Sequence, residues 1–148
     1  INKIMGTRSL TKIIERYEDF QTKEKKEEVL TTMYRQYDGY PSGHGYDLAN
    51  WLDKFTIVNG IPLGGTQTIA NGATCLAAQM FAYFKDGPGG IYLYSPYTND
   101  VGEEYLYKIY IEEGADIYIE AWDTYKLEPI FKGTPEEFMT MIKTEEHA

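Results

Sequence analysis

The feature that most constrains the fold is a strongly apolar segment, predicted to be a helix from Ala73 to about Lys85. Its apolar residues form two stripes at helical spacing: Leu76, Met80 and Phe84, and Ala73, Ala77 and Phe81. Asn71 offers an N-cap, and Gly87-Pro88-Gly89-Gly90 ends the helix. A helix that is apolar on most sides must be covered by another layer. We therefore expect a central buried helix, packed across a β-sheet.

The strands of that sheet are predicted from the alternation of apolar and polar residues with period two. They cover Thr7 to Ile14, Val29 to Gln36, Ile91 to Tyr94, Tyr105 to Ile111, Asp116 to Trp122 and, at an edge, Leu127 to Lys132. The first two are expected to pair as a hairpin, because the segment between them, Tyr17 to Glu28, is too polar for a core. Within it, Lys23 to Glu28 is predicted to be a solvated hairpin tip or a frayed helix.

Two further helices complete the predicted fold. One apolar helix face is formed by Leu48, Trp51, Leu52 and Phe55. Near the C-terminus, Thr134-Pro135-Glu136-Glu137 has the residues of a capping box and begins a last helix. The predicted fold class is α+β: a mainly antiparallel sheet of five or six strands packed on two principal helices, with a short C-terminal helix. We expect one domain over residues 1–148, in which residues 1–4 are an extension without a role.

Composition and charge narrow the range of functions. A formal net charge of −9 argues against a general nucleic-acid surface, which needs clustered Lys and Arg, although a pocket for a small anion remains compatible with it. The single cysteine, Cys75, is expected to be a buried, inert thiol. The sequence shows no secretory signal and no long apolar run, so we expect a soluble cytoplasmic protein without a membrane partner. The acidic segment from Tyr97 to Glu104 lacks EF-hand spacing, and we predict no metal and no cofactor.

The segment from Tyr34 to Gly45 is the predicted ligand-binding loop, because it gathers His, Arg, Tyr and Gly residues between a strand and a helix. Ser42 is a plausible N-cap of that helix, and Gly43 and Gly45 leave backbone N–H groups open to a ligand. Such N–H groups at a helix start favour phosphate or carboxylate. The remaining predicted ligand-binding residues are Arg8, Arg35, Tyr37, Asp38, Tyr40 and His44.

In this hypothesis Arg35, with Arg8 beside it, holds a phosphate, His44 donates to it, and Tyr37 or Tyr40 stacks on a base. The alternative is an ordinary turn, since Gly, Pro, Asp and Ser are common turn residues and no P-loop or Gly-x-Gly-x-x-Gly pattern is present. Two neighbouring features also stay open. The segment from Thr56 to Asn71 is a lid or a passive connector, and Gln79 is a satisfied core amide or a ligand contact.

Five blocks of sequence resemble a widespread family of small proteins from phages and bacteria. The blocks are Met5 to Thr11, Tyr34 to Gly45, Asn71 to Gln79, Phe84 to Tyr92 and Gly102 to Tyr105. Phage proteins of this size and kind include sponges that sequester cyclic nucleotide signals of bacterial antiviral defence. The resemblance thus implies such an activity in a bacterial host, without assigning it to particular residues.

Three functions follow from these patterns, in order of preference. The first is a protein that binds and sequesters a small phosphorylated ligand such as a cyclic nucleotide. The second is a protein–protein interaction module that uses a Tyr-rich sheet face or an edge strand, and a homo-oligomer is among the alternatives. The third is a hydrolase or phosphodiesterase in which His44 is general acid or base and Asp38 orients it. Catalysis ranks last because the usual nucleophile constellations are absent from the sequence.

Overall fold

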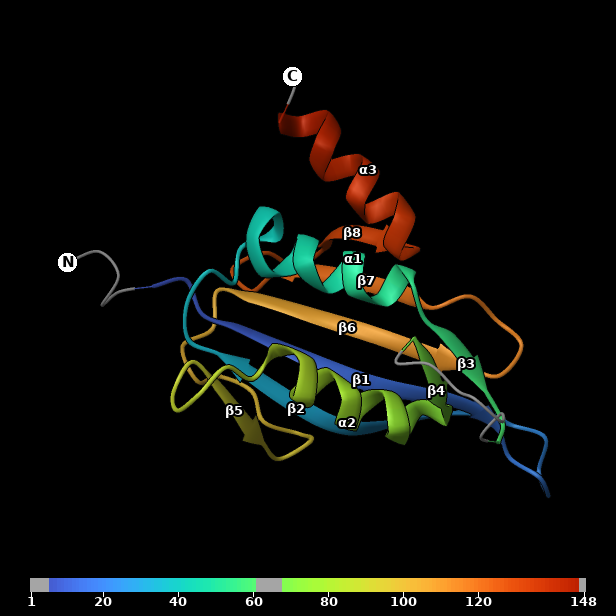
Figure 1. Cartoon of the computed structure of the whole chain (residues 1–148). Coiled ribbons are helices and arrows are strands. Elements are labelled where there is room, and N and C mark those ends of the chain that lie inside the picture. Colours follow the sequence, from blue (N-terminus) through green and yellow to red (C-terminus); the bar gives the residue numbers. More distant parts are fainter. Residues whose placement is uncertain (1–5, 61–67, 147–148) are drawn as a thin grey trace.

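A computed structural model of the chain describes residues 6–60 and 68–146 (Figure 1). The main sheet has six strands: β1 (Ser9–Glu18), β2 (Lys25–Arg35), β5 (Ile91–Tyr94), β6 (Tyr105–Glu112), β7 (Tyr118–Asp123) and β8 (Pro129–Gly133). Two short strands form a separate pair: β3 (Thr56–Val58) and β4 (Ile69–Asn71). The helical elements are a π-helical turn, η2 (Pro41–Gly45), and three α-helices: α1 (Tyr46–Asp53), α2 (Gly72–Phe84) and α3 (Pro135–Glu146).

The strand order in the main sheet is β5-β2-β1-β6-β7-β8. Neighbouring strands run antiparallel except β1 and β6, which pair in parallel at the centre. The predicted α+β fold with a mainly antiparallel sheet is therefore confirmed. The parallel pair joins an N-terminal hairpin, β1 with β2, to a second antiparallel unit formed by β6, β7 and β8.

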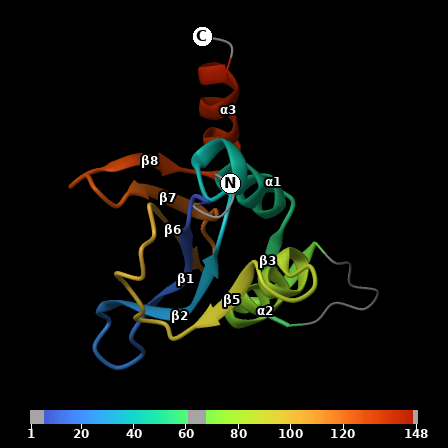
Figure 2. The same cartoon turned by 90° about the vertical axis from the view of Figure 1, so that its left-hand side faces the viewer.

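Helices α1 and α2 cover one face of the sheet side by side, and α3 lies next to α1 over the β7 and β8 side (Figures 1 and 2). The core lies between these layers. Its fully buried large side chains on the helix face include Ile13, Met33, Tyr107 and Ile109 from the sheet and Leu48, Leu76, Met80 and Phe138 from the helices. Helix α2 packs on the sheet as predicted, but the expectation that it is buried on most sides is wrong: Ala73, Leu76, Ala77 and Met80 are buried, Cys75 is partly exposed, and Ala82 and Tyr83 are exposed. None of the described helices is long and apolar enough to span a membrane.

Figure 2 shows no described helix on the opposite face of the sheet. Lys12 lies on that face, because strand residues alternate and its neighbour Ile13 faces the helices, and it holds a loop there. Its Nζ donates to Thr32 Oγ1, Pro96 O and Thr98 O, each at 2.8 Å. Burial lowers the pKa of this amine, and the nearby Glu103 carboxylate opposes that shift. Three good acceptors are what a buried ammonium requires. This cation is thus a structural anchor for the segment after β5.

The hairpin connection is shorter than predicted. Strand β2 begins at Lys25, so the charged residues up to Glu28 lie in a paired strand and do not form a solvated tip or a frayed helix. The turn before it is closed by Asp19, whose Oδ1 accepts the N–H groups of Gln21 and Thr22 at 2.9 Å. One opposite-charge pair supports this strand end across the ladder: Arg16 Nε meets Glu27 Oε2 at 2.8 Å.

The capping box at α3 is present as predicted. Thr134 N–H donates to Glu137 Oε1 at 2.8 Å, and Glu137 N–H donates to Thr134 Oγ1 at 3.3 Å. The backbone hydrogen bond from Thr134 lowers the pKa of the Glu137 carboxyl. Helix α3 ends at Glu146, and the second histidine of the chain, His147, lies outside the described residues.

Removing the cap should have a measurable effect on folding. We expect Thr134→Ala to lower the free energy of unfolding by about 1 kcal/mol, because an orphan N–H at the helix start loses its acceptor. Urea denaturation measures this change. Thr134→Ser keeps the hydroxyl and should unfold like the wild-type protein within a few tenths of a kcal/mol. Equal stability of Thr134→Ala and Thr134→Ser would show that the box is not a stabilising cap.

Candidate functional site

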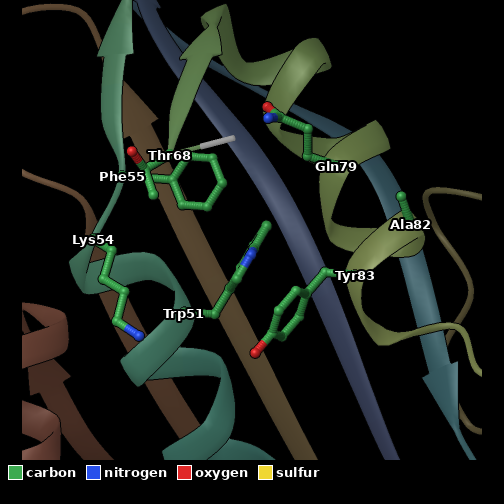
Figure 3. A pocket seen from close by; sticks show the side chains of 7 residues that line it. All are labelled: Trp51, Lys54, Phe55, Thr68, Gln79, Ala82 and Tyr83. Carbon is green, nitrogen blue, oxygen red and sulfur yellow. The ribbon is translucent and has the colours of Figure 1, made fainter. Parts of the chain in front are cut away.

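A pocket of about 530 Å³ opens between α1 and α2, beside the β3–β4 pair (Figure 3). It is lined by Trp51, Lys54, Phe55, Thr68, Gln79, Ala82 and Tyr83. Small-molecule sites are concave, mostly apolar, and carry a few polar groups that fix the orientation of the ligand. The lining of this pocket, with three aromatic rings, one amine, one amide and two hydroxyls, has that composition.

The three rings are arranged around Trp51, whose indole lies between the other two in Figure 3. Its ring centroid is 4.7 Å from that of Phe55, edge to face, and 5.6 Å from that of Tyr83, stacked at 23°. Trp51 is only 7% exposed, whereas Tyr83 is 60% exposed. The inner ring is therefore held by packing, and the outer one presents its surface to solvent at the mouth of the pocket.

Helical spacing explains why these side chains face one another. Trp51 and Phe55 are four residues apart, which puts them on the same side of the chain as it leaves α1. Gln79 and Tyr83 are likewise four residues apart on α2, so they face the groove together. The sequence pattern assigns Trp51 and Phe55 to an apolar helix face, leaves the role of Gln79 open and makes no assignment for Tyr83.

The Gln79 amide is hydrogen-bonded within the protein. Its Nε2 donates to Ile69 O at 3.2 Å and its Oε1 accepts from Cys75 Sγ at 3.4 Å, so the amide ties α2 to β4. The same side chain also lines the pocket. The segment from Thr56 to Asn71 contributes β3 and β4, which pair in parallel, and Thr68 at the pocket wall. Its central part, residues 61–67, lies outside the described residues, so the lid hypothesis is not addressed.

The predicted anion seat in the Tyr34 to Gly45 loop is wrong in its central element. The N–H of Gly43 donates to Tyr40 O at 2.9 Å, that of His44 to Asp38 O at 2.8 Å, and that of Gly45 to Tyr40 O at 3.3 Å. These three N–H groups already donate to backbone carbonyls of the same loop and are not open to a ligand. Ser42 is not the N-cap either, because η2 continues directly into α1, whose N-cap residue is Gly45.

The loop is held against the sheet by packing. Tyr107 Oη donates to Gly39 O at 2.7 Å in a buried hydrogen bond. A Cβ atom added at Gly45 would lie 2.9 Å from Tyr107 Oη and 3.1 Å from Phe138 Cζ. A glycine is therefore required here by the close approach of η2 to the core rather than by a ligand.

His44 is fully buried, with 0% of its surface exposed. Its Nε2 is 3.1 Å from Thr11 Oγ1, and its ring meets Phe84 and Tyr107 edge to face, with centroids 5.0 and 5.8 Å away. Nδ1 has no hydrogen-bond partner among the described residues. Burial, and secondly the charge of Arg35, lower the pKa of His44 to about 3, so the ring is neutral near pH 7. Neither phosphate donation nor acid–base catalysis by His44 is compatible with this placement, because no substrate can reach it.

The other predicted residues are only partly brought together. Arg35 and Tyr37 line a second, smaller cavity of about 220 Å³, together with Phe84, Asp86, Gly89 and Gly90. Arg8 lies elsewhere, against Gly102, where an added Cβ would be 2.6 Å from Arg8 Nη1. Tyr40 packs on its own loop, since a Cβ at Gly43 would be 2.8 Å from its ring. Of the predicted ligand-binding set, Arg35 and Tyr37 thus share a cavity, while Arg8 and Tyr40 line neither that cavity nor the α1–α2 pocket.

Comparisons with protein-family models, with curated proteins and with solved structures find no match to this chain. The described residues also contain no group of three or more His, Cys, Asp or Glu that could hold a metal ion. A functional assignment therefore depends on the chemistry of the two cavities.

Proposed function

We propose that the protein binds a small ligand that carries a planar ring and negative charge, and that it sequesters the ligand without transforming it. The observation that carries this proposal is the pocket between α1 and α2, where Tyr83, stacked on Trp51 with one side and 60% exposed, offers an aromatic surface to a flat ring. Every nucleobase has a flat π-face, and base–aromatic stacking contributes about 1–3 kcal/mol per base. Lys54 adds a positive charge at the same pocket, and Gln79 adds an amide.

Binding is favoured over catalysis by what lines the pocket. Among the described residues that line the pocket there is no His, Cys, Asp or Glu, so none of these side chains has the acid–base chemistry of a typical catalytic pair. Lys54 and Thr68 alone do not form a nucleophile with an adjacent general base and an orienting group. The resemblance of the chain to phage and bacterial proteins makes cyclic nucleotides of antiviral defence the first ligands to test.

Ligand binding can be followed through Trp51 itself. The chain has two tryptophans, and Trp122 lies in β7, away from the pocket, so Trp122→Phe leaves Trp51 as the only indole reporter. Cyclic dinucleotides and cyclic mononucleotides are titrated while its fluorescence is recorded, and a thermal shift is measured in parallel. At 100 times Kd the ligand should stabilise the fold by about 2.7 kcal/mol. After heat release, chromatography should return the nucleotide intact.

Tyr83→Ala should weaken binding roughly 5- to 150-fold, which corresponds to the loss of one stacking contact. Tyr83 is largely exposed, so the fold should survive the change. Tyr125→Ala is the matched control, because Tyr125 is 81% exposed in the connection between β7 and β8. Equal affinities of the two variants would rule out the pocket as the site, and a chemically altered nucleotide would show turnover in place of sequestration.

A further inference from the structure

We propose that the smaller cavity beside Arg35 is an anion-binding subsite that accepts a phosphate group. The argument for an anion site comes from the residues of this cavity alone. Assigning the phosphate to the same ligand whose ring enters the α1–α2 pocket rests in addition on the proposed function. The cavity has a volume of about 220 Å³ and lies where the end of β2 meets the connection between α2 and β5.

The first observation is a half-buried guanidinium without a counterion. Arg35 Nε donates to Tyr37 O at 2.8 Å, and its guanidinium lies 5.6 Å from the centroid of the Tyr37 ring. None of the ion pairs in residues 6–60 and 68–146 includes Arg35. The bond from Nε fixes the orientation of the group, and the terminal NH₂ groups have no acceptor in the described part of the chain. Two such N–H groups match the paired oxygens of a phosphate.

The second observation is that the neighbouring cation, Lys85, already donates its hydrogen bonds to backbone carbonyls. Lys85 Nζ donates to Gly89 O at 2.9 Å and to Ile91 O at 2.7 Å, and it lies 5.4 Å from the centroid of the Tyr92 ring. These contacts hold the glycine-rich connection in place as one wall of the cavity. Arg35 is therefore the cation among the lining residues that remains available to a ligand.

Gly89 and Gly90 form part of the cavity wall and place no side chain in the cavity. Gly89 and Gly90 have φ angles of 78° and 74°, which favour glycine, and neither carries a side chain that would fill the cavity. A Cβ at Gly90 would lie 3.1 Å from Tyr37 Oη, so even a methyl group would crowd the space beside Arg35. The wall thus allows a ligand to approach the backbone closely.

Asp86 gives the cavity a second, opposing charge. It lines the same cavity, yet it forms no ion pair with Arg35 within the 4.0 Å limit for such a pair. Its carboxylate repels a phosphate and therefore sets an upper limit on affinity. Neutralising Asp86 should tighten anion binding, whereas neutralising Arg35 should weaken it. These opposite effects distinguish a specific subsite from a general response to surface charge.

The two cavities share the end of α2. Tyr83 lines the ring pocket and Phe84, the next residue, lines the Arg35 cavity. Their Cα atoms are about 3.8 Å apart, as in any trans peptide, and their rings meet edge to face at 4.9 Å. The two cavities are thus lined by neighbouring residues of α2, and a ligand that joins a flat ring to a phosphate has the groups that each of them would take. Nucleotides have that construction, and nucleosides lack the phosphate.

The subsite is tested first with inorganic phosphate as the probe. In ¹H–¹⁵N NMR spectra of the whole chain, phosphate should cause saturable shifts of the Gly89 and Gly90 amide signals and of the Arg35 Nε–H signal. Arg35→Gln should weaken this binding at least tenfold, Arg35→Lys should weaken it less, and Asp86→Asn should tighten it several-fold. Shifts that do not saturate, or equal affinities in wild type and Arg35→Gln, would overturn the proposal. Arg35→Lys gives the same comparison if Arg35→Gln does not fold.

A second titration connects the subsite to the ring pocket. In the wild-type protein a nucleoside monophosphate should bind more tightly than its nucleoside, and Arg35→Gln should reduce this ratio at least tenfold while nucleoside affinity stays unchanged. Tyr83→Ala should weaken both ligands. Nucleoside binding without phosphate binding at Arg35 would overturn the subsite and leave the proposed function standing. Phosphate binding at Arg35 with no nucleoside binding would overturn the proposed function and leave the anion site standing.

Discussion

Between pH 6.5 and pH 4 the free energy of unfolding should fall more steeply in the wild-type protein than in His44→Gln. The His44 pKa is about 3 in the folded protein, and an unfolded histidine has a pKa of about 6.5. As the pH drops below 6.5, His44 therefore binds a proton in the unfolded chain but stays neutral in the folded protein. Stability is lost by about 1.4 kcal/mol per pH unit, or about 2 kcal/mol at pH 5, and the loss continues down to the folded pKa.

The difference between the two pH dependences is the quantity to measure. Urea denaturation at pH 7, 6 and 5 gives the free energy of unfolding of each protein, and the carboxyl groups contribute nearly equally to both. His44→Gln is expected to be less stable at pH 7, because the packing around a buried ring is lost. His147→Gln is the matched control and should retain the wild-type slope. Parallel curves for wild type and His44→Gln would show that His44 is not held neutral by burial.

Phe138→Ala is expected to cause the largest loss of stability, about 3–5 kcal/mol. Phe138 is fully buried, and its ring meets that of Phe131 edge to face at 5.0 Å. It also lies under the end of η2, since a Cβ at Gly45 would be 3.1 Å from its Cζ. The side chain thus joins α3 and β8 to the loop above the core. A loss of this size is a large part of the roughly 5–15 kcal/mol that stabilises a typical domain.

Urea denaturation at pH 7 tests this expectation. Thr140→Ala is the matched control on the exposed face of α3, where Thr140 Oγ1 donates only to Glu136 O of its own helix. It should change the free energy of unfolding by no more than about 0.5 kcal/mol. If Phe138→Ala is no less stable than Thr140→Ala, then α3 is not an integral part of the core.

Features set by local sequence could be predicted from the sequence. The apolar stripes of α2, the alternation in β6 and β7 and the reciprocal bonds of Thr134 and Glu137 all depend on residues that are close along the chain. The bounds of β2 were less predictable. Its charged first residues look like a solvated turn, yet they continue the ladder with β1, where Arg16 pairs with Glu27 and Glu18 lies opposite Lys25.

The site could not be predicted, because its identity depends on contacts between distant segments. A Gly-rich loop with a histidine has the same composition whether it binds a ligand or packs on a sheet. Tyr107 and Phe138, which come much later in the chain, pack against this loop. Tyr107 contacts the His44 ring and donates a hydrogen bond to Gly39 O, so the loop is part of the packed core. Trp51 and Tyr83 are spaced like core residues, and only the arrangement of α1 and α2 leaves a pocket beside them. Of the predicted set, Arg35 and Tyr37 line one cavity, and Phe84 and Asp86, which line it with them, were not in the predicted set.

The parallel pairing of β1 with β6 has a consequence for how the chain is made. During synthesis β1 and β2 are made early and can pair with each other. The other edge of β1 has no partner until β6 has been made. An exposed strand edge invites pairing with foreign chains. A nascent chain that has not yet reached Tyr105 therefore has an unpaired β1 edge. We expect the need for chaperone protection to be greatest during this interval.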